Sequence, residues 1–264
     1  MEMMGSSSDH GVPGPEAPEP WLTRFEAAAA ARSAAAGQDG RLLPDQLCQA
    51  VVEVTGVQGA AISVYLGGDV AVPIGASDLA STTGEALQFT LREGPCFSSY
   101  SRREPVLVAD LGRSSSPAWS QWPLYAEQLT RRTPYQAVFA YPLLKNDIVA
   151  MGSLSLYSTS AGLPQYRAQL PGIASRITDR LLEADLDVVA EGGSEREWLN
   201  GPAAMRRRLV WLAQGMTIQA NRITPGQAME LLRAQAFSAD RLLDDVAEDI
   251  VAGHVSVPVL ESHQ

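Results

Sequence analysis

The stretch "AVFAYPLLKNDIVAMGSLSLYST", residues 137–159, decides the fold class of this protein. Two runs of aromatic, β-branched and small residues flank the polar turn "KND", which predicts two strands joined by a short connection. Outward from this pair, residues 41–185 predict a helix, two strands, a helix, a strand, a helix, two strands and a helix, in that order. This order predicts an antiparallel sheet with helices on its faces, an α+β domain.

The remaining elements of this domain follow from local patterns. Helices are predicted over residues 43–55 with Gly56 as the stop, from residue 81 into a loop near 96, over 120–133, and after Pro171. Strands are predicted over residues 59–68, 71–77 and 104–111.

Bulk composition restricts the class of protein. The chain has 264 residues, 45% of them hydrophobic, which indicates one large or two modest globular domains. No run approaches the roughly 18 apolar residues of a membrane span. Residues 1–20 lack the basic and apolar segments of a secretory signal, so we expect a disordered leader and a cytoplasmic protein. Residues 21–39 are alanine-rich and predict a helix or a linker, and residues 254–264 are expected to be a tail.

The histidines argue against haem binding and against catalysis. His10, His254 and His263 all lie outside residues 40–185, which excludes a His-ligated haem in that domain. The sequence has no cluster with metal-ligand spacing, no glycine-rich phosphate loop and no pair of a nucleophile and a base. We therefore expect no metal site, no certain cofactor and no enzymatic activity.

Residues 40–185 resemble a known family of sensor domains. The motif "EALQFTLREGPCFSSYSRREPVLVADL", residues 85–111, followed by "AVFAYPLLKNDIVAMGSLSLY", residues 137–157, is similar to the GAF domains of actinobacterial regulators. The shared features are the Gly-Pro-Cys tripeptide, the "PVLVADL" strand and a last strand that contains glycine. The resemblance implies a sensing fold with a pocket for a small molecule, which the motif does not identify.

Cys96, in that tripeptide, has two interpretations. It follows Pro95 at a candidate helix start, where the helix N-terminus is expected to lower the pKa of the thiol. One interpretation is a redox-active or ligand-contacting sensor thiol. The other is a small buried apolar side chain, and the two cysteines, Cys48 and Cys96, are too few for a disulfide framework.

Residues 186–204 predict a helical connector. Before it, Ile173, Ile177 and Leu181 recur at helical spacing, and a second helix is predicted from Ser194 to Ala220 with a Ser194–Glu197 capping box. The apolar stripe of the second helix consists of Trp198, Met205, Leu209, Leu212 and Met216. Two interpretations stay open: the helices form a dimer stalk, or they pack back on their own domains.

Residues 205–253 predict three helices. The first ends near Asn221, and Thr224, Pro225 and Gln227 predict a capping box with proline at the first position of the second helix. The second helix is expected to bury Ala228, Leu231 and Leu232. The third is expected to begin near Ser238, to stop at Gly253, and to bury Leu242, Leu243, Val246, Ala247, Ile250 and Val251.

The pattern "VWLAQGMTIQANRITPGQAMELLRAQAFSADRLLDDVAEDIV", residues 210–251, resembles the ANTAR domain, a transcription antitermination module. The resemblance implies binding to paired hairpin loops in nascent RNA, with no DNA expected. Cations for phosphates, amides for base edges and flat groups for stacking are the side chains such loops require. The candidates are Arg206, Arg207, Arg208, Gln214, Arg222, Arg233, Gln235, Phe237 and Arg241. Gln214 stands where family members often carry lysine.

The charge of the chain permits RNA contact on only one face of the C-terminal helices. The formal net charge of the chain is −10, and residues 205–253 are neutral overall, with their acidic residues concentrated on the third predicted helix. A basic face with an acidic back fits that distribution and predicts salt-sensitive RNA binding. The hypothesis is a homodimeric, signal-responsive RNA-binding regulator. Its rivals are a sensor whose C-terminal helices dock on a protein partner, and a methionine sulfoxide reductase on the same fold.

Overall fold

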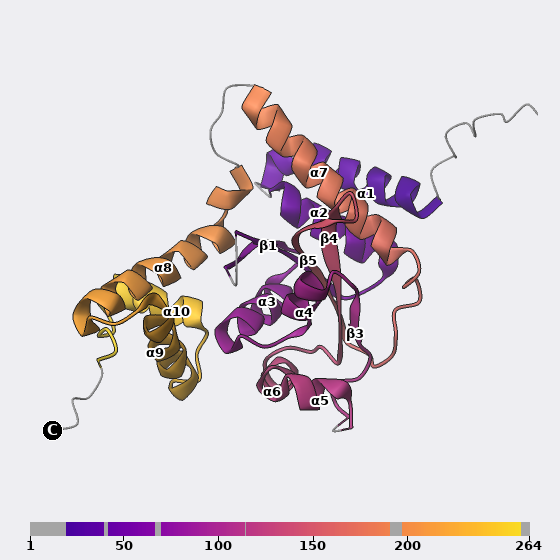
Figure 1. Ribbon diagram of the computed structural model, residues 1–264. Coiled ribbons are helices and arrows are strands. Elements are labelled where there is room, and N and C mark those ends of the chain that lie inside the picture. Colours follow the sequence, from indigo (N-terminus) through magenta and orange to yellow (C-terminus); the bar gives the residue numbers. More distant parts are fainter. Residues whose placement is uncertain (1–19, 40–41, 67–69, 114, 191–196, 260–264) are drawn as a thin grey trace, which may run out of the picture.

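Five antiparallel strands form one sheet at the centre of the protein (Figure 1). The computed structural model describes residues 20–39, 42–66, 70–113, 115–190 and 197–259. The spatial order of the strands is β2-β1-β5-β4-β3. Their bounds are β1 (Gly59–Tyr65), β2 (Ala71–Ala76), β3 (Val106–Val108), β4 (Ala137–Lys145) and β5 (Val149–Ser158). The α+β class and the antiparallel sheet are therefore confirmed.

The β4–β5 hairpin is the longest pairing in the sheet and forms where the sequence predicts it. Asn146 and Asp147, in the turn, have φ angles of 51° and 56°, a left-handed conformation that these two residue types tolerate better than most. Gly152 of β5 faces β1 closely, because a Cβ there would lie 2.2 Å from the carbonyl oxygen of Ser63. Glycine at this position therefore permits the central strands to approach each other.

Three helices cover one face of the sheet: α1 (Pro20–Asp39), α2 (Leu43–Thr55) and α7 (Leu170–Ala190). The alanine-rich segment is thus helical, and its Phe25 is fully buried. Ile173, Ile177 and Leu181 of α7 lie in the same core. These positions were candidates for a dimer stalk; instead α7 packs back on its own sheet, because burying its apolar face there removes it from water.

Four helices cover the opposite face: α3 (Leu79–Leu91), α4 (Pro95–Arg102), α5 (Pro117–Gln121) and α6 (Pro123–Arg132). The helix predicted from residue 81 ends at Leu91, and a short loop leads to α4, whose start at Pro95 agrees with the candidate helix start at Cys96. One expectation was wrong here. The single helix predicted over 120–133 is divided in two at Trp122, whose extended φ of −141° interrupts it before Pro123. We call residues 42–190 the sheet domain.

The C-terminal helices are η1 (Glu197–Asn200), α8 (Pro202–Asn221), α9 (Pro225–Ser238) and α10 (Leu243–Val251). We call α8, α9 and α10 the helical module; it lies beside β2 and α3 (Figure 1). The predicted capping box is confirmed: the Thr224 side chain accepts from the Gln227 backbone and the Gln227 side chain from the Thr224 backbone. In the second helix Ala228 and Leu232 are buried, whereas Leu231 is half-buried.

Two predicted helix boundaries in this region were wrong. The helix expected to run through to Ala220 is interrupted at Gly201, and Trp198 of η1 is buried in the core of the sheet domain. Ser194 lies outside the described residues. The third helix begins at Leu243 and not near Ser238, because Asp240 adopts a left-handed φ of 51° and Arg241 N–H bonds back to Ala236 O at 2.9 Å. This turn ends α9, and α10 therefore begins several residues later than predicted.

Candidate functional site

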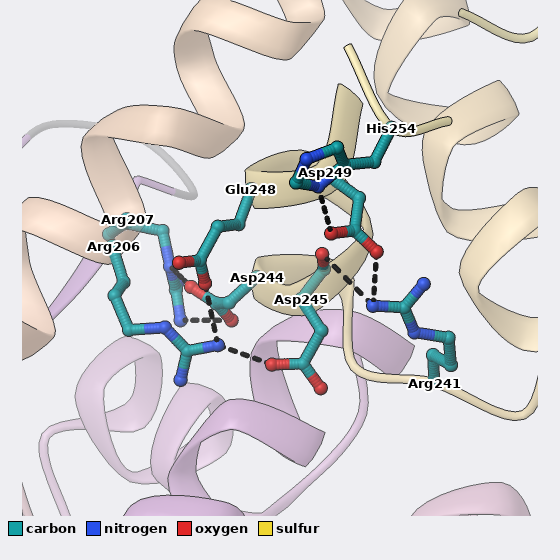
Figure 2. A network of polar contacts seen from close by, with 8 residues as sticks. All are labelled: Arg206, Arg207, Arg241, Asp244, Asp245, Glu248, Asp249 and His254. Carbon is teal, nitrogen blue, oxygen red and sulfur yellow. Dashed lines mark hydrogen bonds and ion pairs between the residues drawn. The ribbon is translucent and has the colours of Figure 1, made fainter. Parts of the chain in front are cut away.

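Arginines predicted to contact RNA form ion pairs with the acidic residues of α10 (Figure 2). Arg206 of α8 pairs with Asp245, and its guanidinium nitrogen lies 3.6 Å from a carboxylate oxygen of Glu248. Arg241 pairs with Asp249 at 2.8 Å, and His254 contacts the same carboxylate at 3.4 Å. The acidic residues of the third helix are therefore paired with arginines of the module. They do not form the separate acidic face, opposite a basic one, that the sequence predicted.

Arg207 is the largest fully buried side chain of the described residues, with 1% of its surface exposed. Its Nε donates to Asp244 of α10 at 3.0 Å, and Nη1 donates to the carbonyl oxygen of Ala71 on β2 at 2.9 Å. The guanidinium carbon lies 3.3 Å from the ring centroid of Phe89 on α3. Burial lowers the pKa of Arg207, and Asp244 opposes that effect. In this conformation no external ligand reaches the guanidinium group.

Backbone carbonyls hold three further candidates. Arg233 donates to Phe89 O at 3.4 Å and lies 5.4 Å from the centre of that ring. The amide of Gln214 donates to Pro225 O at 2.8 Å, and the amide of Gln235 donates to Ser256 O at 3.4 Å. Gln214 thus joins α8 to the start of α9.

Three candidates face solvent. Arg208 on α8 and Arg222 at the α8–α9 turn are exposed, and Phe237 near the end of α9 is 53% exposed. Arg222 has a left-handed φ of 55° and ends α8. These side chains are accessible to RNA without rearrangement, although Arg208 donates to the Met205 sulfur at 3.5 Å. Arg206, Arg207, Arg233 and Arg241 are held by partners on other elements or by ion pairs.

A second candidate site is a buried polar cluster between the sheet and α3. Glu85 is only 4% exposed, and its carboxylate accepts from Ser63 at 2.7 Å, Ser155 at 3.0 Å and Tyr157 at 3.3 Å. Gln88 adds a donor at 3.1 Å. These four donors compensate the burial of the carboxylate. The hydrogen bonds join α3 to β1 and β5.

Cys96 adjoins this cluster. Its backbone N–H donates to the Gln88 side chain at 2.9 Å, and the Tyr65 hydroxyl lies 3.6 Å from its sulfur. The expectation that the helix N-terminus lowers the pKa of the thiol was wrong: burial, followed by the charge of Glu85, raises the pKa of Cys96 well above its usual value. A buried neutral thiol is a weak nucleophile.

The sequence carried a signal for the Glu85 cluster that pattern analysis missed. Ser63 lies in an otherwise apolar stretch of β1, Ser155 lies between two leucines of β5, and both serines are buried. A serine at a buried strand position needs a hydrogen-bond partner, so these two residues indicate a polar group on the facing helix. Phe89 and Asp244, the partners of Arg207, had no such signal.

Two cavities adjoin the sheet domain, and Glu85 is among the lining residues of the second. One of about 470 Å³ lies between the end of α2 and residues 160–166. The other, of about 420 Å³, lies where the sheet domain meets the helical module; Asp45, Ile74, Asp78, Pro202 and Arg206 are among its lining residues. Both have the size of a small-molecule site.

Metal and membrane sites were searched over the described residues. Among them, no three His, Cys, Asp or Glu side chains are grouped as the ligands of a metal ion. None of the helices in that part of the chain combines the length and apolar character needed to cross a bilayer.

Comparisons with known proteins give remote similarities only. No protein-family model matches the sequence, and no curated protein matches it. Similar solved structures include the GAF domain of a phosphoenolpyruvate-protein phosphotransferase from Coxiella burnetii, with a TM-score of 0.44, 14% identity, and coverage of 63% of this chain and 98% of that chain. A GAF domain region of a putative membrane protein from Geobacter sulfurreducens has a TM-score of 0.40, 15% identity, and coverage of 60% and 95%.

The third comparison is an enzyme, a free methionine-R-sulfoxide reductase from Neisseria meningitidis in complex with its substrate. Its TM-score is 0.38 at 14% identity, over 59% of this chain and 87% of that chain. Solved structures similar to this chain thus include GAF domains, matched over about 60% of its length. At this distance none of their activities or ligands transfers to the present protein.

Proposed function

We propose that this protein is a non-catalytic, cytoplasmic regulator in which a GAF sensor domain, residues 40–185, controls an ANTAR-type RNA-binding module, residues 205–253. The module binds tandem hairpin loops in nascent RNA and prevents terminator formation. The signal is a small molecule bound by the sheet domain. The Glu85 cluster and the two cavities supply polar and apolar groups for such a ligand.

One observation supports the RNA function most directly: the helical module presents cations and an aromatic ring at its surface. Arg208 and Arg222 are exposed, and so is Phe237. Phosphate contact by guanidinium groups and base stacking on an aromatic ring are the interactions by which single-stranded loops are bound. Two modules in a homodimer would each take one hairpin and gain affinity through effective concentration.

The test is a fluorescence-anisotropy titration of the full chain with tandem-hairpin RNA at two salt concentrations. We expect Arg222→Ala to weaken binding by about tenfold and to reduce the salt dependence by about one phosphate contact. Arg167→Ala, an exposed arginine in the loop before α7, is the matched control and should leave the affinity unchanged. Binding to the tandem hairpins no tighter than to scrambled RNA would contradict the proposal.

A second candidate function is docking of a protein partner on the same helices. The apolar stripe of α8 supports it, because Met205 and Leu212 are 45% and 53% exposed and exposed apolar surface of this kind marks interaction sites. A partner that remains bound to the full chain after nuclease treatment, and is lost when Leu212 is replaced by Glu, would favour this alternative over RNA.

A further inference from the structure

The sheet domain contacts the helical module through Phe89 at the end of α3. Phe89 is 4% exposed and shares one apolar cluster with Val210, Leu232, Leu243 and other residues of the module. The guanidinium groups of Arg207 and Arg233 lie against its ring, and Arg233 also donates to its carbonyl oxygen. Two of the arginines predicted to bind phosphate thus have their partners on the sheet domain.

A second contact fixes the turn between α9 and α10. Arg131 and Arg132, at the end of α6, both pair with Asp240; the guanidinium of Arg132 donates to its carboxylate at 2.6 Å and to its backbone oxygen at 2.8 Å. The N-cap residue of α10, Leu242, supplies no side-chain acceptor. The Thr90 hydroxyl of α3 accepts from Leu243 N–H at 3.0 Å instead. The sheet domain therefore caps the last helix of the module.

We propose that these contacts hold the helical module in a closed state that excludes RNA from Arg207 and Arg233, and that RNA binds after the contacts open. The inference rests on the proposed function, because it assigns these guanidinium groups to phosphate in the open state. Arg207 at 1% exposure does not reach a phosphate. Arg207 is enclosed by Phe89, Ala71 and Asp244, so its closed position excludes phosphate contact. Arg233 is half-buried and has one guanidinium nitrogen committed to Phe89 O.

The energetics of the buried pair permit opening. Arg207 and Asp244 are 1% and 6% exposed at their side chains, and the loss of hydration offsets most of the attraction between two buried charges. Opening returns both groups to water. Asp244 belongs to the module itself, so in the open state phosphate competes with a solvated carboxylate for Arg207. The closed state is thus stabilised mainly by the apolar contact at Phe89, and the exposed Asp240 pairs add a smaller contribution.

The experiment compares the full chain with its Arg131→Glu/Arg132→Glu variant, which repels Asp240. The variant loses positive charge, so electrostatics alone predicts weaker RNA binding, whereas opening predicts binding at least about fivefold tighter, because the apparent affinity scales with the open fraction. Hydrogen exchange without RNA reports opening directly: amides of residues 239–243 should exchange faster. Arg102→Glu/Arg103→Glu, an adjacent exposed pair at the end of α4, is the charge-matched control and should show neither effect.

Thr90→Val is a milder second variant that removes only the acceptor for Leu243 N–H. It should change exchange and affinity in the same direction, which keeps the test informative if the double variant misfolds. Unchanged exchange in both variants overturns the closed state. Faster exchange without tighter RNA binding, in a chain that does bind hairpins, overturns RNA exclusion. An opened variant that binds hairpins no better than scrambled RNA instead overturns the proposed RNA function.

Discussion

At the scale of single residues, the buried Arg207–Asp244 ion pair joins α8 to α10. Removal of one partner from a buried ion pair leaves a charge without compensation, and this costs more than the pair itself contributes. The neighbouring carboxylate of Asp245 pairs with Arg206 at the surface, where its side chain is 37% exposed. Two adjacent aspartates of one helix turn thus have opposite environments, and they allow a matched comparison.

We expect Asp244→Ala to lower the free energy of unfolding by about 3–5 kcal/mol, because Arg207 stays buried without its carboxylate. Asp245→Ala should change it by less than about 1 kcal/mol, as is typical for exposed pairs. Urea denaturation of both variants, followed by circular dichroism, measures the difference. Equal losses in the two variants would show that burial of Arg207 is relieved by a local rearrangement.

Among the elements, α3 connects the two candidate sites, since it carries Glu85 at its centre and Phe89 near its end. Its start is fixed by Asp78, whose side chain accepts from Ser81 N–H at 2.9 Å. Partial burial by itself would raise the pKa of Asp78, but hydrogen bonds from Ser77, Ser81 and Tyr135 outweigh it and lower the pKa. The ionised cap therefore stabilises the folded state.

We expect Asp78→Ala to cost about 1 kcal/mol of stability at neutral pH, the usual value of an N-cap. Because the pKa is lower in the folded state, the stabilisation is present above the ordinary pKa of aspartate, about 3.9, and is lost as the pH falls through the lowered folded value. Denaturation midpoints at pH 7 and at low pH measure this. Asp78→Asn keeps a side-chain acceptor at the N-cap but has no carboxyl group to titrate. The difference in stability between this variant and the wild type should therefore depend on pH.

At the scale of the whole molecule, α8 leaves part of its apolar stripe exposed to solvent. Met205 and Leu212 are exposed, and Leu209 and Met216 are half-buried. Their spacing of four, three and four residues is that of a two-stranded coiled-coil seam. Because α7 packs on the sheet, α8 is the helix that remains for the proposed homodimer, and its pairing would place two modules side by side.

Leu212→Glu should shift the full chain from dimer to monomer in sedimentation-velocity experiments, since it places a charge in the apolar seam. Gln219→Glu introduces the same charge at an exposed polar position of α8 and should leave the sedimentation coefficient unchanged. A wild-type chain that sediments as a monomer at micromolar concentration would remove the homodimer from the proposal.

The sequence by itself determined the features that depend on residues close together in the chain. The β4–β5 hairpin, the capping box at Thr224 and the buried face of α10, with Leu243, Val246 and Ile250, all lie where local patterns predict them. Periodicity and capping are set within about one turn of backbone, so neighbouring residues suffice to specify them.

Only the tertiary structure decided the partners of the charged and reactive groups. Arg207 was predicted to face RNA; it is buried against Ala71 and Phe89, more than a hundred residues earlier in the chain. Cys96 starts a helix as predicted, yet burial raises the pKa of its thiol. Desolvation and ion pairing depend on which distant surfaces meet, and no local pattern contains that information.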